Sequence, residues 1–284
     1  MKPVELAKDI FWIGAVDYNK RNFHGYSRSP RGTTYNSYLI RDEKNVVFDT
    51  VDNDYAGTMF CRLAKLMPLD KVDYIVVNHT EKDHAGALCQ LVERCKPEKI
   101  ITSTMGKRFM EAQFDTTGWP IEVVKTGDVI NIGKRNIHFV ETRMLHWPDS
   151  MMTYCKEEKA LFSCDFLGAH YSFAPMIDTE LKDTEGYRRA FKEYFDAIFG
   201  PFKPFVVAGL AKISALDIEY VCNSHGPVLT SAGQLGYAVA EYGKMSRIVK
   251  NDPKKIPVFY CSAYGCTAAL AEKIAARADN LYTV

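Results

Sequence analysis

The ten residues from 77 to 86 constrain this chain most, because they carry four potential metal ligands within six positions. Residues 72–77, directly before the ligands, form a near-continuous apolar run with β-branched side chains, which is typical of a strand buried on both faces. Residues 85–95 follow with helical spacing of apolar side chains. α/β folds place functional side chains on such strand-to-helix loops. We therefore expect a metal site formed in part by His79, Glu81, Asp83 and His84.

Three further ligand-type residues each follow a predicted strand. His146 lies where a strand stops, and Pro148 prevents its continuation. Asp165 directly follows an apolar strand, where a carboxylate is costly unless it is paired or bound to a metal. His225 follows a third strand before a turn. These side chains can reach the same sheet edge as His79–His84, and imidazoles with carboxylates are usual ligands of zinc, iron and manganese.

Composition excludes several classes of function. With 284 residues and 47% apolar content, the chain can bury one sizeable domain plus a remnant, or two small domains. Its 36 basic and 35 acidic residues argue against a nucleic-acid or membrane-surface partner. No apolar segment reaches the length of about 20 residues that spans a bilayer, and the N-terminus has no signal core, so we expect a soluble, cytoplasmic protein. The eight scattered cysteines predict reduced, mostly buried thiols.

Strands and helices alternate along the chain, and its tail changes character after residue 250. Residues 22–36 form a long polar loop of the kind that carries function. Residues 121–124 and 129–132 are predicted to be paired strands, and the tail to be a linker at 251–255, a strand at 256–260 and a Ser/Thr/Gly loop before a final helix. Helices are expected at residues 55–67, 85–95, 106–114, 185–199, 205–215, 232–250 and 268–277.

The full ligand set resembles that of the metallo-β-lactamase superfamily over roughly residues 1–250. The resemblance implies an α/β fold, an αββα sandwich with a two-metal site along one sheet edge. The set comprises seven residues, each at or after a strand end: His79, Glu81, Asp83, His84, His146, Asp165 and His225.

Hydrolytic zinc members of that superfamily usually have histidine where this chain has Glu81. This exchange, together with residues 23–26, 31–38 and 146–151, closely resembles the flavodiiron proteins, non-haem diiron enzymes that reduce dioxygen to water, nitric oxide to nitrous oxide, or both. The resemblance implies that His79, Glu81 and His146 bind one iron and that Asp83, His84 and His225 bind the other. Asp165 and a hydroxide or oxo group would bridge the two irons.

The same resemblance gives two histidines a catalytic role outside the ligand set. His24 and His170 would donate hydrogen bonds or protons to the bound diatomic ligand. An ordinary loop residue is the alternative for His24, and a similar structural role is the alternative for His170.

Flavodiiron proteins also carry a complete flavodoxin-like domain whose FMN feeds electrons to the irons, usually across a head-to-tail dimer. Residues 262–267 resemble the phosphate loop of that domain, but the chain ends at Val284. We therefore expect a diiron domain at 1–250, a linker and incomplete flavodoxin-like remnant at 251–284, no FMN on this chain, and a homodimer.

Three functions stay open at this point. The first is an O2 or NO reductase that receives electrons from an external donor such as rubredoxin or a flavoprotein. The second is a diiron sensor of oxygen or iron that forms a long-lived oxygen adduct and signals to a partner protein. The third is a zinc or manganese hydrolase, which Glu81 disfavours. A longer parent chain, of which this sequence is a piece, would restore the first function.

Overall fold

The computed structural model describes residues 2–23, 25, 27–249 and 256–279. Its contacts divide the chain into two compact units, Met1–Ser246 and Arg247–Val284. The two units are described separately below.

The first unit contains a seven-stranded sheet that carries the 77–86 stretch. Strands β8, β9, β10 and β11 run parallel to one another. The pairs β1–β2, β2–β7 and β7–β8 are antiparallel. A parallel strand covered on both faces reads as an uninterrupted apolar run, which explains why every residue of β9 is buried. The strands, in spatial order, are β1 (Val4–Ala7), β2 (Ile10–Trp12), β7 (Tyr38–Ile40), β8 (Val46–Phe48), β9 (Tyr74–Val77), β10 (Lys99–Thr102) and β11 (Ile121–Val123).

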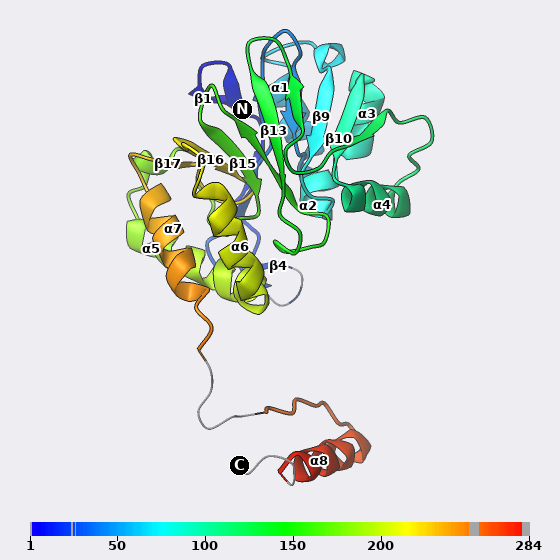
Figure 1. Cartoon of the computed structure of the whole chain (residues 1–284), viewed down its shortest axis with the longest axis vertical. Coiled ribbons are helices and arrows are strands. Elements are labelled where there is room, and N and C mark those ends of the chain that lie inside the picture. The colour runs from blue at the N-terminus through cyan, green and yellow to red at the C-terminus, as the bar shows by residue number, and fades with distance from the viewer. Residues whose placement is uncertain (1, 24, 26, 250–255, 280–284) are drawn as a thin grey trace. The chain divides into compact units, whose positions relative to one another are not determined.

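Three helices cover the outer face of this sheet: α1 (Ala56–Leu63), α3 (Leu88–Cys95) and α4 (Thr104–Gln113) (Figure 1). Their apolar stripes form one core cluster with the outward side chains of the strands, such as Met59 with Ile75. The helix predicted at 85–95 is in fact two, a one-turn helix α2 (Lys82–Ala85) followed by α3. Gly86 lies between them, and only glycine fits at this position because a Cβ would lie 2.6 Å from the Asn53 nitrogen.

A six-stranded sheet forms the other half of the unit. Its strands are antiparallel neighbours except for the parallel pair β15 and β16. Helices α5 (Thr184–Tyr194), α6 (Lys203–Ile213) and α7 (Leu235–Met245) cover its outer face with an aromatic-rich core, and α5 continues into a π-helical segment, Phe195–Phe199 (Figure 1). The strands, in spatial order, are β12 (Val129–Asn131), β13 (Asn136–Glu141), β14 (Met151–Cys155), β15 (Ala160–Cys164), β16 (Tyr220–Asn223) and β17 (Leu229–Thr230).

The inner faces of the two sheets pack on each other. Phe48 of the first sheet and Phe162 of the second stack with ring centroids 4.0 Å apart, within a cluster that includes Trp12, Val76 and Phe139. The order of layers is therefore helix, sheet, sheet, helix. This confirms the predicted αββα sandwich.

Two predictions about the strands of the first unit are wrong. β11 and β12 do not pair with each other, because β11 pairs with β10 in the first sheet and β12 pairs with β13 in the second. The connection between β11 and β12 therefore crosses from one sheet to the other. The predicted loop at 22–36 contains regular structure: β4 (Asn22–Phe23) pairs with β5 (Ser27–Arg28), and β6 (Thr33–Tyr35) pairs with β3 (Ala15–Asp17).

In the second unit, α8 (Cys266–Asp279) agrees with the predicted final helix. The strand predicted at 256–260 is wrong, because these residues have neither helical nor strand structure and have no strand beside them among the described residues. Leu270 and Ile274 on α8 are half exposed. The linker predicted at 251–255 lies outside the described residues.

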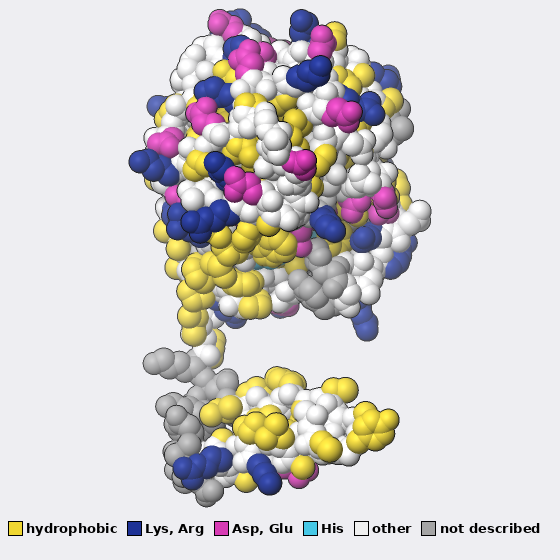
Figure 2. Space-filling view, turned by 90° about the vertical axis from the view of Figure 1, so that its right-hand side faces the viewer, with side chains coloured by type: hydrophobic (Ala, Val, Ile, Leu, Met, Phe, Trp, Pro, Cys, Tyr) yellow, Lys and Arg dark blue, Asp and Glu magenta, His cyan; other side chains and the backbone are white. Residues whose placement is uncertain are grey.

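Two surface properties bear on the choice of partners. Within the part of the chain that the structure describes, no helix combines the length and the apolar character needed to cross a membrane. On the face of the first unit shown in Figure 2, acidic and basic side chains are interspersed and form no large block of one sign.

Candidate metal centre

All seven predicted ligands belong to segments that follow strands of the two sheets. His79 and Glu81 lie in the loop after β9, and Asp83 and His84 lie on α2. His146 lies in the segment between β13 and β14, Asp165 directly after β15, and His225 in the turn after β16. Because the strand ends face the same edge of the sandwich, residues up to 146 positions apart in sequence can meet there.

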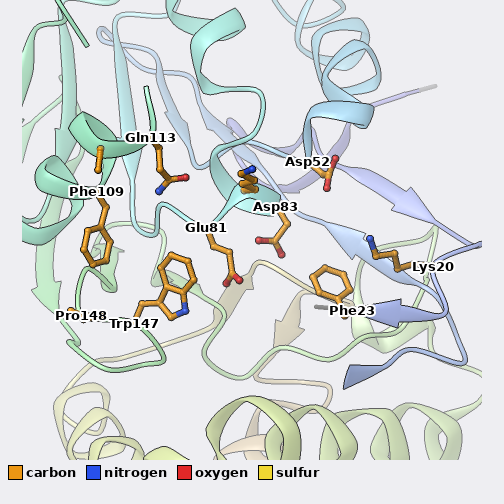
Figure 3. A pocket seen from close by; sticks show the side chains of 11 residues that line it. Lys20, Phe23, Asp52, Glu81, Asp83, Phe109, Gln113, Trp147 and Pro148 are labelled. Atoms are coloured by element: carbon orange, nitrogen blue, oxygen red, sulfur yellow. The ribbon is translucent and has the colours of Figure 1, made fainter. Parts of the chain in front are cut away.

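A pocket of about 750 Å³ opens at this edge. Figure 3 shows Glu81 and Asp83 pointing into it between two aromatic walls, Phe109 with Trp147 on one side and Phe23 on the other. The wall is mainly apolar, and its other charged and polar side chains are Lys20, Asp52, Lys82 and Gln113. Glu81 and Asp83 also line a smaller inner cavity, together with His146, Asp165 and His225.

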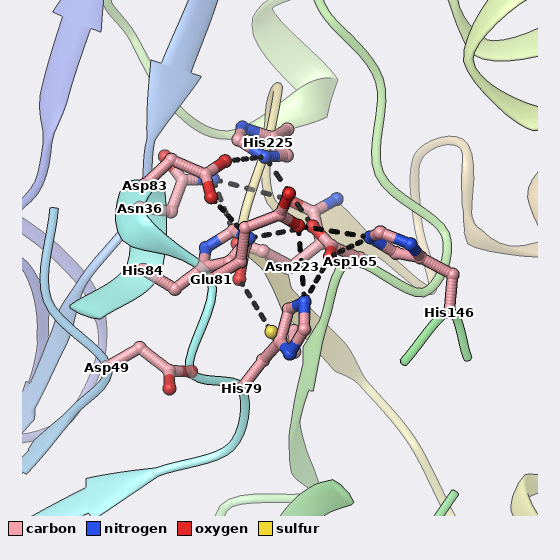
Figure 4. Close-up of polar contacts among 12 residues, drawn as sticks. Asn36, Asp49, His79, Glu81, Asp83, His84, His146, Asp165, Asn223 and His225 are labelled. Carbon is pink, nitrogen blue, oxygen red and sulfur yellow. Dashed lines mark hydrogen bonds and ion pairs between the residues drawn. The ribbon is translucent and has the colours of Figure 1, made fainter. Parts of the chain in front are cut away.

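One group of ligands gathers around one oxygen of Asp165 (Figure 4). His146 Nε2 lies 3.2 Å from Glu81 Oε2 and 3.3 Å from Asp165 Oδ2. His79 Nε2 lies 3.3 Å from the same Glu81 oxygen and 3.7 Å from the same Asp165 oxygen. The candidate ligand atoms of these four residues all lie within 4.8 Å of one another, which is compact enough to surround one ion.

A second group gathers around the other oxygen of Asp165. His84 Nε2 lies 3.1 Å and His225 Nε2 3.5 Å from Asp165 Oδ1. Asp83 completes this group, with its Oδ2 3.0 Å from His225 Nε2 and its Oδ1 3.4 Å from His84 Nε2. Each oxygen of Asp165 therefore faces a different set of imidazoles, which is the geometry that a bridging carboxylate requires.

The state of these buried atoms fits a metal site. Asp83 Oδ1, Asp165 Oδ2 and both ring nitrogens of His84 make no hydrogen bond of normal geometry to any described residue. Buried polar atoms without hydrogen bonds are costly, so a chain rarely keeps several of them together unless a ligand satisfies them. The donor set of imidazoles and carboxylates suits iron, zinc or manganese, and its three anionic ligands favour the higher oxidation state of a redox metal.

The electrostatics of the metal-free cluster support this interpretation. Burial raises the pKa of the Glu81 carboxyl, but hydrogen bonds with His146 and His79 outweigh burial and lower this pKa to about 2. Burial lowers the pKa of the His84 imidazole, but Asp165 and Asp83 outweigh it and raise this pKa to about 9. Glu81 is therefore an ionised carboxylate and His84 a protonated imidazole, and a metal ion that binds His84 would displace this proton.

The outer ring nitrogens of two ligands have fixed partners that the sequence did not reveal. The His79 Nδ1–H faces both carboxylate oxygens of Asp149, at 3.1 and 3.0 Å. The His225 Nδ1–H donates to the Thr34 carbonyl at 2.6 Å. Because an ionised carboxylate and a carbonyl can only accept, both rings direct Nε2 toward the cluster. Asp149 lies three positions after His146, within the stretch 146–151 that carries the family resemblance, but the sequence did not indicate that it contacts His79.

The two predicted catalytic histidines have different outcomes. His24 lies outside the described residues. His170 lies beside the cluster, where its ring is stacked on Phe23 at 4.2 Å and edge-on to His225 at 4.9 Å, with Nδ1 3.0 Å from the Thr33 hydroxyl. Tyr194 is a further neighbour of the cluster, and its hydroxyl donates to Asp165 Oδ1 at 3.0 Å. The catalytic roles of both histidines stay predictions.

A family model and several known proteins are similar to this chain. Residues 33–226 match a family model described as ODP family beta lactamase. The chain is 39% identical to the flavo-diiron protein FprA2 of Clostridium acetobutylicum over 97% of this chain and 69% of that protein. It is 36% identical to the anaerobic nitric oxide reductase flavorubredoxin of Klebsiella pneumoniae subsp. pneumoniae, over 96% of this chain and 56% of that protein.

A solved structure is also similar to this chain. The rubredoxin oxygen:oxidoreductase of Desulfovibrio gigas superposes with a TM-score of 0.84 and 39% identity, covering 88% of this chain and 63% of that chain. The present chain thus spans between 56% and 69% of the length of these three proteins. The extent and identity of these matches establish that the chain belongs to the flavodiiron family.

Proposed function

We propose that this chain holds two iron ions and reduces dioxygen, and also nitric oxide, with electrons from an external donor. Relatives named for O2 and NO reduction support the reaction class. One iron would bind His79, Glu81 and His146, and the other Asp83, His84 and His225, with Asp165 between them. The observation that carries the proposal is the orientation of Asp165, whose two oxygens face the two groups separately.

The bound irons would supply the electrons that reduce the diatomic substrate. The surrounding side chains would control water and protons. The inner cavity is lined by Ile198 as well as by His170 and Tyr194, so it offers one apolar wall and two groups that can carry a proton. Tyr194 is fully buried, and burial first and then Asp165 keep the pKa of its phenol well above the ordinary value, so Tyr194 acts as a hydrogen-bond donor rather than as an anion.

Electrons would enter through the outer pocket. Its aromatic side chains, Phe109 and Trp147, lie between solvent and the cluster, and Trp147 is edge-on to His79 with ring centroids 5.0 Å apart. The external donor of these electrons would be rubredoxin, a flavoprotein or a similar protein. The absence of FMN from this chain, the homodimer and the cytoplasmic location stay predictions.

The alternatives have less support. The names of the relatives do not favour a sensor that forms a long-lived adduct. A zinc or manganese hydrolase is disfavoured by Glu81, which stands where hydrolytic zinc members of the superfamily usually have histidine. The two alternatives predict different behaviour: a sensor binds a single equivalent of O2, and a hydrolase functions without a reductant.

The test loads the purified protein anaerobically with Fe(II), measures iron per chain, and follows O2 and NO consumption with chemically reduced rubredoxin as the donor. We expect two irons per chain and many equivalents of substrate consumed. Asp165→Asn should lower the iron content and reduce turnover at least roughly 100-fold, because it removes one of the two bridging oxygens.

The matched control is Asp178→Asn. Asp178 is also a fully buried carboxylate, but it binds Thr230 and lies outside the cluster. Full iron retention in Asp165→Asn would contradict the bridging role, and consumption limited to one equivalent of O2 would contradict the enzyme.

A further inference from the structure

The two halves of the proposed metal centre differ in how their histidines are held from outside. His79 faces a carboxylate through Nδ1, whereas His225 faces a neutral backbone carbonyl. The Nδ1 atom of His84 has no hydrogen-bond partner among the described residues. The first half therefore has a charged outer partner that the second half lacks.

Asp149 is that partner, and the structure holds it rigidly. Asp149 and the His79 ring are both fully buried, so solvent does not screen their interaction. Asp149 Oδ2 also accepts from the Thr80 backbone nitrogen at 2.8 Å and from the Thr80 hydroxyl at 2.7 Å. Its backbone carbonyl accepts from the Ser103 hydroxyl at 2.8 Å. These contacts fix the position of the carboxylate as well as its charge.

Asp149 also connects two ligand-bearing segments. It lies in the segment before β14 that contains His146, while its carboxylate binds His79 and Thr80 in the loop after β9. One side chain therefore sets the separation of two ligands of the same proposed iron. No described side chain carboxylate makes a corresponding hydrogen bond to the outer nitrogen of His84 or His225.

We propose that Asp149 is a positioning residue that strengthens the binding of one of the two irons, the one held by His79, Glu81 and His146. A carboxylate that accepts from the far nitrogen of a ligating imidazole fixes the ring and its tautomer and makes the near nitrogen a better donor. The two irons then differ in affinity, with Asp149 favouring the first. This inference rests on the proposed metal centre.

The test is a stepwise anaerobic titration of metal-free protein with Fe(II), against a competing chromophoric chelator. Wild-type protein should bind two ions. Asp149→Asn keeps the size of the side chain and removes its charge, so it should weaken the binding of one ion by about 10- to 100-fold and leave the other within about threefold. Asp178→Asn is the matched control, because Asp178 accepts from the Thr230 nitrogen and hydroxyl just as Asp149 accepts from Thr80, and it should change neither step.

The outcomes separate this inference from the proposed function. If wild-type protein binds no pair of ions, the metal centre itself is wrong. If wild-type protein binds two and Asp149→Asn binds both with unchanged affinity, or loses both equally, the role of Asp149 is wrong. If metal-free Asp149→Asn melts at a lower temperature than Asp178→Asn, the Thr80→Val variant provides the test instead. Thr80→Val keeps the Asp149 carboxylate and removes one of its hydrogen bonds, so it should weaken the binding of the same ion severalfold. Unchanged affinity for that ion would overturn the proposal.

Discussion

Two segments of this chain for which the sequence predicts strand, loop and helix have different surroundings in the structure. In residues 74–95, β9 has a parallel neighbour on each side, and its loop carries four of the proposed ligands. In residues 256–279, the described segment contains α8 but no strand, and Phe259 is 91% exposed. The comparison indicates that a helix follows from its own sequence, whereas a strand and the site at its end depend on neighbours that satisfy the backbone and cover the side chains.

One pair of substitutions tests the difference between β9 and the tail most directly. Ile75→Ala removes a fully buried side chain from β9 and should lower the free energy of unfolding by about 3 kcal/mol, because a cavity replaces lost packing. Ile256→Ala removes an exposed side chain and should change it by less than about 0.5 kcal/mol. Urea unfolding followed by tryptophan fluorescence measures both. Equal losses in the two variants would show that the tail is packed as tightly as β9.

A pH titration sharpens the comparison at the first loop. The pKa of His84 in the metal-free cluster is about 9, above the ordinary value for histidine, so below pH 9 an incoming ion must displace its proton. The affinity for Fe(II) should therefore rise with pH by up to about tenfold per unit for each displaced proton and level off above about pH 9. Anaerobic titrations at pH 6.5, 7.5 and 8.5 test this. His84→Asn should make the affinity for Fe(II) depend less steeply on pH. An unchanged slope would show that Fe(II) does not displace a proton from His84.

Thiol reactivity extends the comparison to both units. All eight cysteines are free, and four are exposed rather than mostly buried as the composition predicted: Cys61, Cys89, Cys261 and Cys266. Burial, opposed by weaker neighbouring effects, raises the pKa of Cys155 to about 11 and that of Cys95 to about 12. At pH 8 we expect iodoacetamide to modify Cys261 and Cys266 in native protein and Cys155 only after unfolding. Mass spectrometry of the peptides measures the extent of modification at each cysteine. Rapid labelling of Cys155 in native protein would show that β14 is open to solvent.

The smallest expected effect is no change at all. Chymotrypsin should cut native protein first near Phe259 and Tyr264, which are 91% and 96% exposed, and leave the first unit whole. Because the proposed ligands all lie within Met1–Ser246, the cleaved product should keep its iron and its melting temperature. Loss of iron on cleavage would show that the tail contributes to iron binding. It would also refute a domain boundary near residue 250.

Individual residues show why the sequence predicted much of the site. Asp165 stood out because an ionised side chain after a buried strand requires a partner, and the structure brings several imidazoles to it. His79 to His84 stood out because ligand spacing on a strand-to-helix loop is local information. The hydrogen bonds of Asp149 to His79 and of Tyr194 to Asp165 escaped prediction, because their partners lie 70 and 29 residues away along the chain.

The strand pairing shows the same limit. Residues 121–124 and 129–132 were both correctly expected to be extended, but their pairing was wrong because each joins a different sheet. Short segments of β-branched residues specify an extended backbone, and they do not specify which neighbour supplies the hydrogen bonds.

The sequence by itself determined where most helices and the buried strand β9 lie and which seven residues are candidate ligands, since these depend on periodicity and on the chemistry of single side chains. Only the tertiary structure decided how the two oxygens of Asp165 divide those ligands into two groups, and which histidine receives a charged outer partner. The physical reason is that hydrogen bonds and ion pairs act over a few ångströms in space, and separation along the chain does not encode those distances.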